Sequence, residues 1–454
     1  MLVKLYYFFM YENIHYPFLF LTALLFWILH KRWMRTALLV VTSYAYIWRF
    51  DRKAVFVVLG LTLFTYLIAL LMEKLSKPAI LHKIGVIGLL LILVAFKYLG
   101  FMGGIINSLT SFVSTLPVFK IEKLFLPLGI SYIVFKHISY LTDIYWGIVK
   151  KGSLINFACY SSLYTIFIAG PIERFERLNP QLEAQTDRFQ FTHLKLALQR
   201  IIFGLFKKMV IADWIGYLII PVWQNPIHYS IIIRVLAIFG YSMQIYFDFA
   251  GYSDIAIGSS RLFGLKIMEN FNNPYLAPNI SQFWRRWHIS LSDWIRDYLF
   301  FPLSQNKTSK FWLLFIVPIT AMSLCGLWHG AAWQYIFWGM WHGISISIYQ
   351  IWQYNKRKRK ITFNISNSLS QVLTFGTVTL GWIIFNNGTS LFTSIFNPLG
   401  FLYIFVTLAV YYSILKINIS KYIDIRSFRF MLLTTLALIV FYCGMNTGFI
   451  YDKF

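Results

Sequence analysis

The feature that most constrains the fold of this chain is a series of long apolar blocks. Uncharged stretches run from Tyr16 to Leu29, from Ala54 to Met72, from Ile84 to Phe96 and from Phe430 to Cys443. A helix needs about 20 predominantly apolar residues to cross the hydrocarbon core of a bilayer, and several of these blocks approach that length. Such blocks carry more apolar surface than a soluble globule can bury, so we expect the chain to fold in a membrane.

The composition leads to the same conclusion. Only 13% of the residues are charged and 58% are hydrophobic, whereas soluble chains carry about 25% charged residues. We therefore predict an all-α integral membrane protein, a polytopic bundle of about 11–13 helices by block length. We expect a single membrane domain over residues 1–454, with N-terminal scaffold helices in 1–120, a core in 121–350 and C-terminal helices in 351–454.

The net charge of +24 would also suit a nucleic-acid-binding protein, but the distribution of the basic residues does not. Lysine and arginine form short clusters between apolar blocks, as the positive-inside bias of membrane proteins requires. We therefore expect the lipid bilayer and no nucleic acid as a partner. The clusters His30–Arg35 and Lys356–Lys360 should face the cytoplasm, which places the N-terminus outside.

The sequence offers no evident metal site or disulfide framework. Its three cysteines, at 159, 325 and 443, are isolated and form no C-x-x-C pair. Asp248 and Asp254 are six residues apart without a nearby histidine or cysteine, which makes them a poor metal pair. We expect no metal and no permanently bound cofactor.

Two groups of ionisable residues lie inside otherwise apolar segments. One is Asp248 with Asp254. The other contains Lys136, His137 and Asp143, in which either basic residue could pair with the aspartate. Ionisable groups at membrane depth are costly and are usually paired or functional. They also mark transport paths, so a polysaccharide or solute transporter is one alternative. Transporters often contain two related halves, and no such internal symmetry is evident in this sequence.

Charge, aromatic rings and histidine are concentrated between Glu269 and Gly330. Two tryptophan–histidine pairs, Trp287-His288 and Trp328-His329, are separated by 41 positions (329 − 288). If residues 284–301 form one helix, apolar and aromatic residues recur at spacings of three and four on one stripe, with arginines on the other side. The residues of this stripe are Trp284, Trp287, Leu291, Trp294, Tyr298 and Phe301. Such a helix would lie at the membrane interface or line a wet cavity. Its arginines, Arg285, Arg286 and Arg296, would either hold an anionic reactant or anchor the helix.

His329 lies in the apolar segment 311–330, where no charged residue follows Lys310. A neutral imidazole tolerates such a place, and it can accept a proton from a hydroxyl. The alternative is a buried structural histidine. Cys325, one turn earlier, could carry an acyl group, although packing is the favoured interpretation. The near-copy Gly339-Met-Trp-His-Gly343 would place His342 about 20 Å away on an unbroken helix, unless Gly330 ends that helix.

Several ordered motifs carry a family resemblance. They are Phe283-Trp-Arg-Arg-Trp-His-Ile-Ser-Leu-Ser-Asp-Trp-Ile-Arg-Asp-Tyr-Leu-Phe-Phe-Pro302, Gly326-Leu-Trp-His-Gly330, Leu126-Pro-Leu-Gly-Ile-Ser131, Ile168-Ala-Gly-Pro171, Phe206-Lys-Lys208, Gln244–Asp254 and Glu269-Asn-Phe-Asn272. In order and spacing they resemble the membrane-bound O-acyltransferase family, in particular its bacterial branch that acetylates alginate and peptidoglycan. The resemblance covers about residues 120–345. In Gly381-Trp-Ile-Ile-Phe-Asn386, asparagine stands where the family leads us to expect arginine.

The resemblance implies a multi-pass enzyme of the bacterial cytoplasmic (inner) membrane. Interfacial and re-entrant helices would surround a central funnel, and an acyl group would pass from a cytoplasmic thioester, with acetyl-CoA as donor, to a hydroxyl of an extracytoplasmic polysaccharide. A periplasmic or extracellular acetyltransferase partner could take the group onward. Transfer of D-alanine from a carrier protein to teichoic acid is the enzymatic alternative, and a non-catalytic assembly scaffold is another.

The resemblance also assigns roles to residues. The family's near-invariant histidine falls on His329, which we expect to act as general base, and the second family histidine falls on His288, which would orient a reactant or stabilise an oxyanion. Candidate substrate-binding residues are Arg285, Arg286, Trp284, Trp287, Ser292, Arg296, Trp328 and Asn270.

Overall fold

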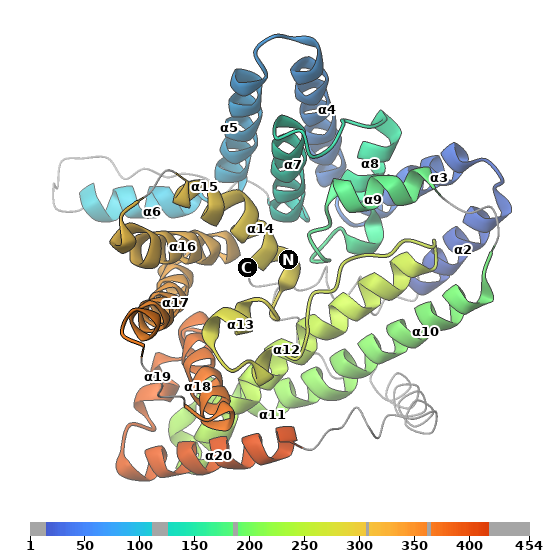
Figure 1. Cartoon of the computed structure of the whole chain (residues 1–454). Helices are drawn as coiled ribbons and strands as arrows, with labels where there is room; N and C mark the ends of the chain where they lie inside the picture. The colour runs from blue at the N-terminus through green and yellow to red at the C-terminus, as the bar shows by residue number, and fades with distance from the viewer. Residues whose placement is uncertain (1–14, 111–125, 185–188, 306–307, 361–364, 417–454) are drawn as a thin grey trace. The chain divides into compact units, whose positions relative to one another are not determined.

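The computed structural model describes residues 15–110, 126–184, 189–305, 308–360 and 365–416. These residues form helices joined by short connections, and no strand occurs among them, which confirms the all-α fold class (Figure 1). Contacts divide the chain into two compact units. Among the described residues, the first comprises those within 199–255 and 269–416, and the second comprises those within 15–198 and 256–268. The three-part division predicted at residues 120 and 350 stays a prediction.

The second unit is built mainly from the N-terminal helices. Asp51 caps α4, because its carboxylate accepts hydrogen bonds from the backbone N–H groups of Lys53 (3.1 Å) and Ala54 (3.0 Å). Proline at the first position of α5 suits a helix start. The helices of this unit are α2 (His15–Ile28), α3 (Arg32–Phe50), α4 (Arg52–Lys74), α5 (Pro78–Lys97), α6 (Leu99–Thr110), α7 (Ile130–Tyr145), α8 (Leu154–Ser162) and α9 (Phe175–Glu183), with a 3₁₀ turn at Tyr164–Ile166.

The first unit contains the remaining helices. Two of them, α10 and α12, have residues in both units. Three segments of it are π-helical: Phe206–Ala212, Arg296–Phe300 and Trp312–Ile316. Its α-helices are α10 (Phe191–Leu205), α11 (Asp213–Gln224), α12 (Ile231–Arg261), α13 (Ile280–Trp284), α14 (Ile289–Ile295), α15 (Phe301–Ser304), α16 (Val317–His329), α17 (Trp333–Lys358), α18 (Asn367–Phe385), α19 (Thr389–Thr393) and α20 (Pro398–Lys416).

Five helices among the described residues are long and apolar enough to cross a membrane. They are Arg52–Lys74, Pro78–Lys97, Ile231–Arg261, Trp312–His329 and Asn367–Phe385. Large apolar side chains on these helices point outward, for example Phe56 (65% exposed) and Leu91 (62%), as lipid-facing positions do. The multi-pass membrane class is thereby confirmed. The number of about 11–13 spans stays a prediction, and the block Phe430–Cys443 lies outside the described residues.

Two ionisable residues of α7, Lys136 and His137, are held by neutral partners. Lys136 donates to the backbone carbonyls of Tyr160 and Ser161. The ring nitrogens of His137 lie 2.9 Å from the Thr65 hydroxyl and 2.8 Å from the Ser161 hydroxyl. The expected pairing of Lys136 or His137 with Asp143 is therefore wrong. Carbonyls and hydroxyls from neighbouring helices satisfy these groups, which indicates a structural role.

In the first unit, buried charges are paired. The Lys208 ammonium lies 2.6 Å from Asp213 Oδ1 and 2.8 Å from Asp248 Oδ1, and all three side chains are 2% exposed. Asp254 forms ion pairs with Arg200 (2.7 Å) and Lys207 (2.6 Å). Both aspartates that were considered as a metal pair are thus bound to basic side chains.

Helices α16 and α17 pack in backbone contact (Figure 1). A Cβ placed on Gly326 would lie 2.0 Å from the Tyr335 carbonyl oxygen, and one on Gly339 would lie 2.1 Å from the Met322 carbonyl oxygen. Small residues at such positions allow membrane helices to approach closely. The helix does end at Gly330, whose backbone is extended at φ −167° and ψ 151°, so the chain reverses there.

Candidate active site

The candidate site lies within the first unit, and its first histidine sits at a break in the predicted helix. The single helix expected over 284–301 is wrong, because α13 ends at Trp284 and α14 begins at Ile289. Between them, His288 adopts a left-handed conformation with φ 42°. Residues other than glycine rarely adopt positive φ, and such strain is often found at functional sites.

Asn270 holds this break in place from another segment. Its backbone carbonyl accepts from the N–H of Ile289 at 2.9 Å. Its side-chain oxygen accepts from the backbone N–H (3.2 Å) and the hydroxyl (2.8 Å) of Ser290, and its amide donates to the Ser253 hydroxyl at 3.2 Å. Asn270 is 1% exposed. Its side chain thus forms hydrogen bonds within the protein that can position the segment of His288, and its substrate-binding role stays a prediction.

The ring of His288 is buried and stays neutral at physiological pH. Burial lowers its pKa to about 3. Its Nδ1 lies 3.5 Å from the Ser290 hydroxyl, and its Nε2 has no hydrogen-bond partner among the described residues. The ring packs edge-on against Phe249 at a centroid distance of 4.6 Å. The neutral ring therefore has one nitrogen, Nε2, that no described residue binds.

His329 is the last residue of α16, and aromatic rings surround it. Its centroid lies 4.9 Å from Trp328, 5.1 Å from Trp338 and 5.6 Å from Phe385. The side chain is 3% exposed. Trp328 also lies 6.4 Å from the ring of His288. The structure thus connects the two predicted histidines through one shared indole.

Sequence reasoning left His342 unassigned, yet it belongs to the same cluster. Its ring lies 5.0 Å from Trp338 and 5.1 Å from Trp284, and it is 0% exposed. The reversal after Gly330 places His342 against the indole that His329 also contacts. Neither ring nitrogen of His342, nor the indole N–H of Trp284 or Trp338, has a partner among the described residues. The repeated Trp-His-Gly motif was the sequence signal for this residue.

The remaining predicted residues occupy two different settings. Trp287 is buried against Trp382 at 4.9 Å. Ser292 donates its hydroxyl to the carbonyl of Trp287 at 2.9 Å. Arg286 donates to Gln282 at 3.1 Å, whereas Arg285 and Arg296 are exposed. Arg296 pairs with Asp293 and Asp297, which raises the pKa of its guanidinium. The arginines thus do not share the buried surroundings of the histidines.

The family model for the membrane-bound O-acyltransferases matches residues 145–375, a range that contains His288, His329 and His342. The chain belongs to this family, which confirms the resemblance and the O-acyltransferase class.

Individual relatives agree with the family model. The chain is 37% identical over 366 residues to the probable alginate O-acetylase of Pseudomonas aeruginosa, covering 77% of this chain and 66% of that protein. It is 31% identical over 356 residues to the peptidoglycan O-acetyltransferase of Helicobacter pylori, covering 72% and 66%. It is 34% identical over 269 residues to the teichoic acid D-alanyltransferase of Bacillus subtilis, covering 57% and 68%. The chain thus matches about two thirds of the length of these relatives.

Proposed function

We propose that this chain transfers an acetyl group across the bacterial cytoplasmic membrane, from a cytoplasmic thioester, acetyl-CoA, to a hydroxyl of an extracytoplasmic polysaccharide. The similarity to a probable alginate O-acetylase over 77% of the chain and to a peptidoglycan O-acetyltransferase over 72% supports a polysaccharide acceptor. Five candidate spans support a membrane location.

The observation that carries the proposal is the setting of His329, a buried histidine at the end of α16 beside Trp328 and Trp338. As general base, its neutral imidazole takes the proton of the attacking hydroxyl while the hydroxyl oxygen bonds to the thioester carbonyl carbon. The carbon–sulfur bond then breaks, the ester forms, and the proton passes to the departing thiolate. The products are an acetylated hydroxyl and a free thiol.

His288 would contribute its open Nε2. Protonated at Nε2, the neutral ring can donate a hydrogen bond to the oxyanion that develops during attack. A donor of this kind is worth most in a site that excludes water, and His288 is 1% exposed. Because His329 is only 3% exposed, neighbouring side chains must move to admit the reactants.

The test replaces His329 with alanine and measures ester-linked acetyl on cell-wall and secreted polysaccharides by mass spectrometry. A general base contributes about 10²- to 10⁴-fold, so acetylation should fall to background while membrane insertion persists. His228→Ala is the matched control, because His228 is exposed and lies outside the ring cluster. Wild-type acetylation in His329→Ala would refute the assignment.

The same experiment separates the alternatives. A D-alanyl ester on teichoic acid, lost in His329→Ala, would indicate the activity named for the Bacillus subtilis relative. That relative matches 57% of this chain, against 77% for the alginate O-acetylase, which favours acetyl transfer. Polysaccharide export that depends on the protein but not on His329 would indicate a transporter.

A further inference from the structure

A cavity in the second unit has a lining suited to a ligand. Its volume is about 450 Å³, within the range of ligand pockets. The end of α2, the start of α3, α9, the start of α10 and residues 263–266 line it. Two kinds of side chain dominate the wall, basic ones and aromatic ones.

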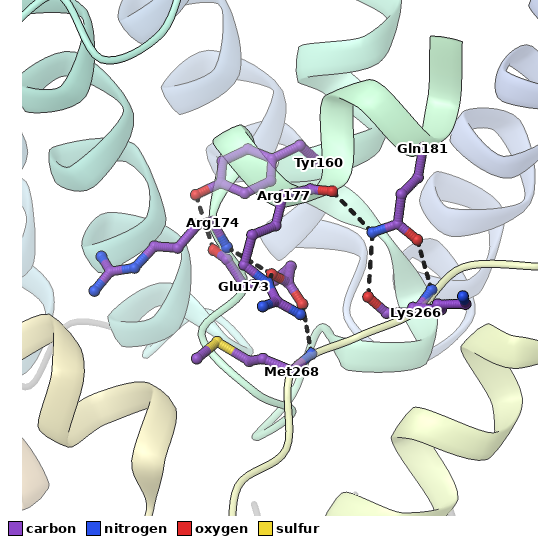
Figure 2. Close-up of polar contacts among 7 residues, drawn as sticks. All are labelled: Tyr160, Glu173, Arg174, Arg177, Gln181, Lys266 and Met268. Atoms are coloured by element: carbon purple, nitrogen blue, oxygen red, sulfur yellow. Dashed lines mark hydrogen bonds and ion pairs between the residues drawn. The ribbon is translucent and has the colours of Figure 1, made fainter. Parts of the chain in front are cut away.

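The basic side chains are Arg35, Arg177 and Lys266, joined by His193. No aspartate or glutamate is among the described residues that line the cavity. Glu173, which is 0% exposed, lies behind the wall and accepts from Arg177 Nε at 3.0 Å and from the N–H of Met268 at 2.8 Å (Figure 2). Among the described residues, the charged side chains that line the cavity are all basic, so the cavity favours an anion.

Hydrogen bonds hold the polar wall of the cavity in position. Gln181 binds the backbone of Lys266 at both ends of its amide, accepting from the N–H at 2.7 Å and donating to the carbonyl at 3.2 Å (Figure 2). The Nδ1 atom of His193 is buried and has no hydrogen-bond partner among the described residues. With a proton on Nδ1, His193 can donate to an anionic oxygen in the cavity.

The aromatic wall is equally fixed. Arg35 is 1% exposed, and its guanidinium carbon lies 5.3 Å from the ring centroid of Phe26 and 5.0 Å from that of Trp27. Trp27 donates its indole N–H to the carbonyl of Leu262 at 2.8 Å. Phe263 packs edge-on against Phe26 at 5.4 Å. A ligand with an apolar part beside its negative charge matches this combination.

The neighbouring surface indicates where such a ligand comes from. The last turns of α2 expose Leu24 (60%) and Ile28 (57%), apolar side chains that suit contact with lipid acyl chains. The end of α2 and the start of α3, which both line the cavity, flank a connector whose basic cluster is predicted to face the cytoplasm. Acyl chains along α2 would bring a lipid headgroup to the level of this connector.

We propose that the cavity binds the phosphate of an amphipathic phosphate ester, with the phosphate at Lys266, Arg177 and His193 and the apolar part against Phe26 and Trp27. An anionic phospholipid of the surrounding membrane is the source that the exposed face of α2 favours. A diffusible ester such as coenzyme A has the same chemistry. The site is additional to the proposed acetyl transfer and does not depend on it.

The test uses native mass spectrometry of the full-length protein in detergent. Phosphatidylglycerol, coenzyme A and inorganic phosphate are added in separate experiments. The variant is Lys266→Gln with His193→Gln, and the control is Lys195→Gln, an exposed lysine of α10 outside the cavity. Loss of two charge-assisted hydrogen bonds should weaken phosphatidylglycerol binding at least about 10-fold, and the control should bind like the wild type.

Each outcome decides a part of the proposal. Weakened retention of phosphatidylglycerol alone assigns the site to lipid, whereas weakened retention of coenzyme A alone assigns it to a diffusible ester. Binding of inorganic phosphate but of neither ester contradicts the role of the aromatic wall, which Trp27→Leu tests directly. Equal retention of every ligand by the variant, the control and the wild type overturns the proposal.

Discussion

The side-chain carbonyl of Asn270 accepts two hydrogen bonds from Ser290, one from its hydroxyl at 2.8 Å and one from its backbone N–H at 3.2 Å. These bonds, with a third from Asn270 to Ser253, fasten the segment that carries His288. Since all the groups are buried, their loss leaves donors and acceptors without partners. Asn270 therefore controls the position of the histidine from outside its own segment.

Replacing Asn270 with alanine should destabilise the protein by about 1–3 kcal/mol and lower acetylation more than stability alone explains, because His288 loses its support. Thermal unfolding in detergent and polysaccharide acetyl content provide the two measurements. Asn272→Ala is the control, since Asn272 is exposed and its hydrogen bond to Arg286 joins backbone atoms. Equal behaviour of the two variants would contradict the positioning role.

Burial lowers the pKa of His288, which predicts that the free energy of unfolding of the protein depends on pH. Its folded-state pKa is about 3, whereas a histidine in an unfolded chain has a pKa of about 6.5. Between these values the unfolded chain binds a proton that the folded protein does not, so the free energy of unfolding falls as pH falls below about 6.5. Asparagine tolerates positive φ and does not titrate, so His288→Asn should show a shallower decline in melting temperature between about pH 7 and pH 4. Identical slopes would show that His288 does not contribute.

Lys208 should be essential for folding. Replacing it with methionine removes the cation between Asp213 and Asp248 and leaves two buried carboxylates together. Breaking a buried pair in this way costs about 3–5 kcal/mol, so the variant should express poorly in the membrane and unfold at a lower temperature. Lys195→Met, at an exposed position, should behave like the wild type. A stable Lys208→Met protein would argue against the pairing.

The contact between α16 and α17 predicts that Gly339 tolerates no larger residue. In Gly339→Ala the new methyl would lie 2.1 Å from the Met322 carbonyl oxygen, so the helices must separate and the rings of His329 and Trp338 must shift. We expect overpacking of about 1–3 kcal/mol and a marked loss of acetylation. In Gly376→Ala, on α18, the methyl meets nothing within 4 Å, so this variant should retain activity. The thermal shift and acetyl content of both variants check the comparison.

The sequence predicts the fold class because the length and hydrophobicity of each apolar block are local properties, and they determine whether a helix can cross the bilayer. The helix expected over 284–301 failed for a non-local reason. Hydrogen bonds from Asn270 compete with helical ones around His288, and no periodicity within 284–301 contains that information. The motif resemblance pointed to His288 and His329 together, but their shared contact with Trp328 depends on packing between segments 41 positions apart (329 − 288). His342 was missed because the expected separation assumed a helix that in fact ends at His329.

The backbone contact between α16 and α17 also limits how molecules can travel to the histidines. Where the Gly326 and Gly339 backbones meet carbonyl groups of the opposite helix, no gap remains for a thioester arm or a sugar chain to slip through. Reactants must therefore reach His329 by a path that does not pass between α16 and α17. Such a path would be closed by side chains, and changes of side-chain rotamer could open it.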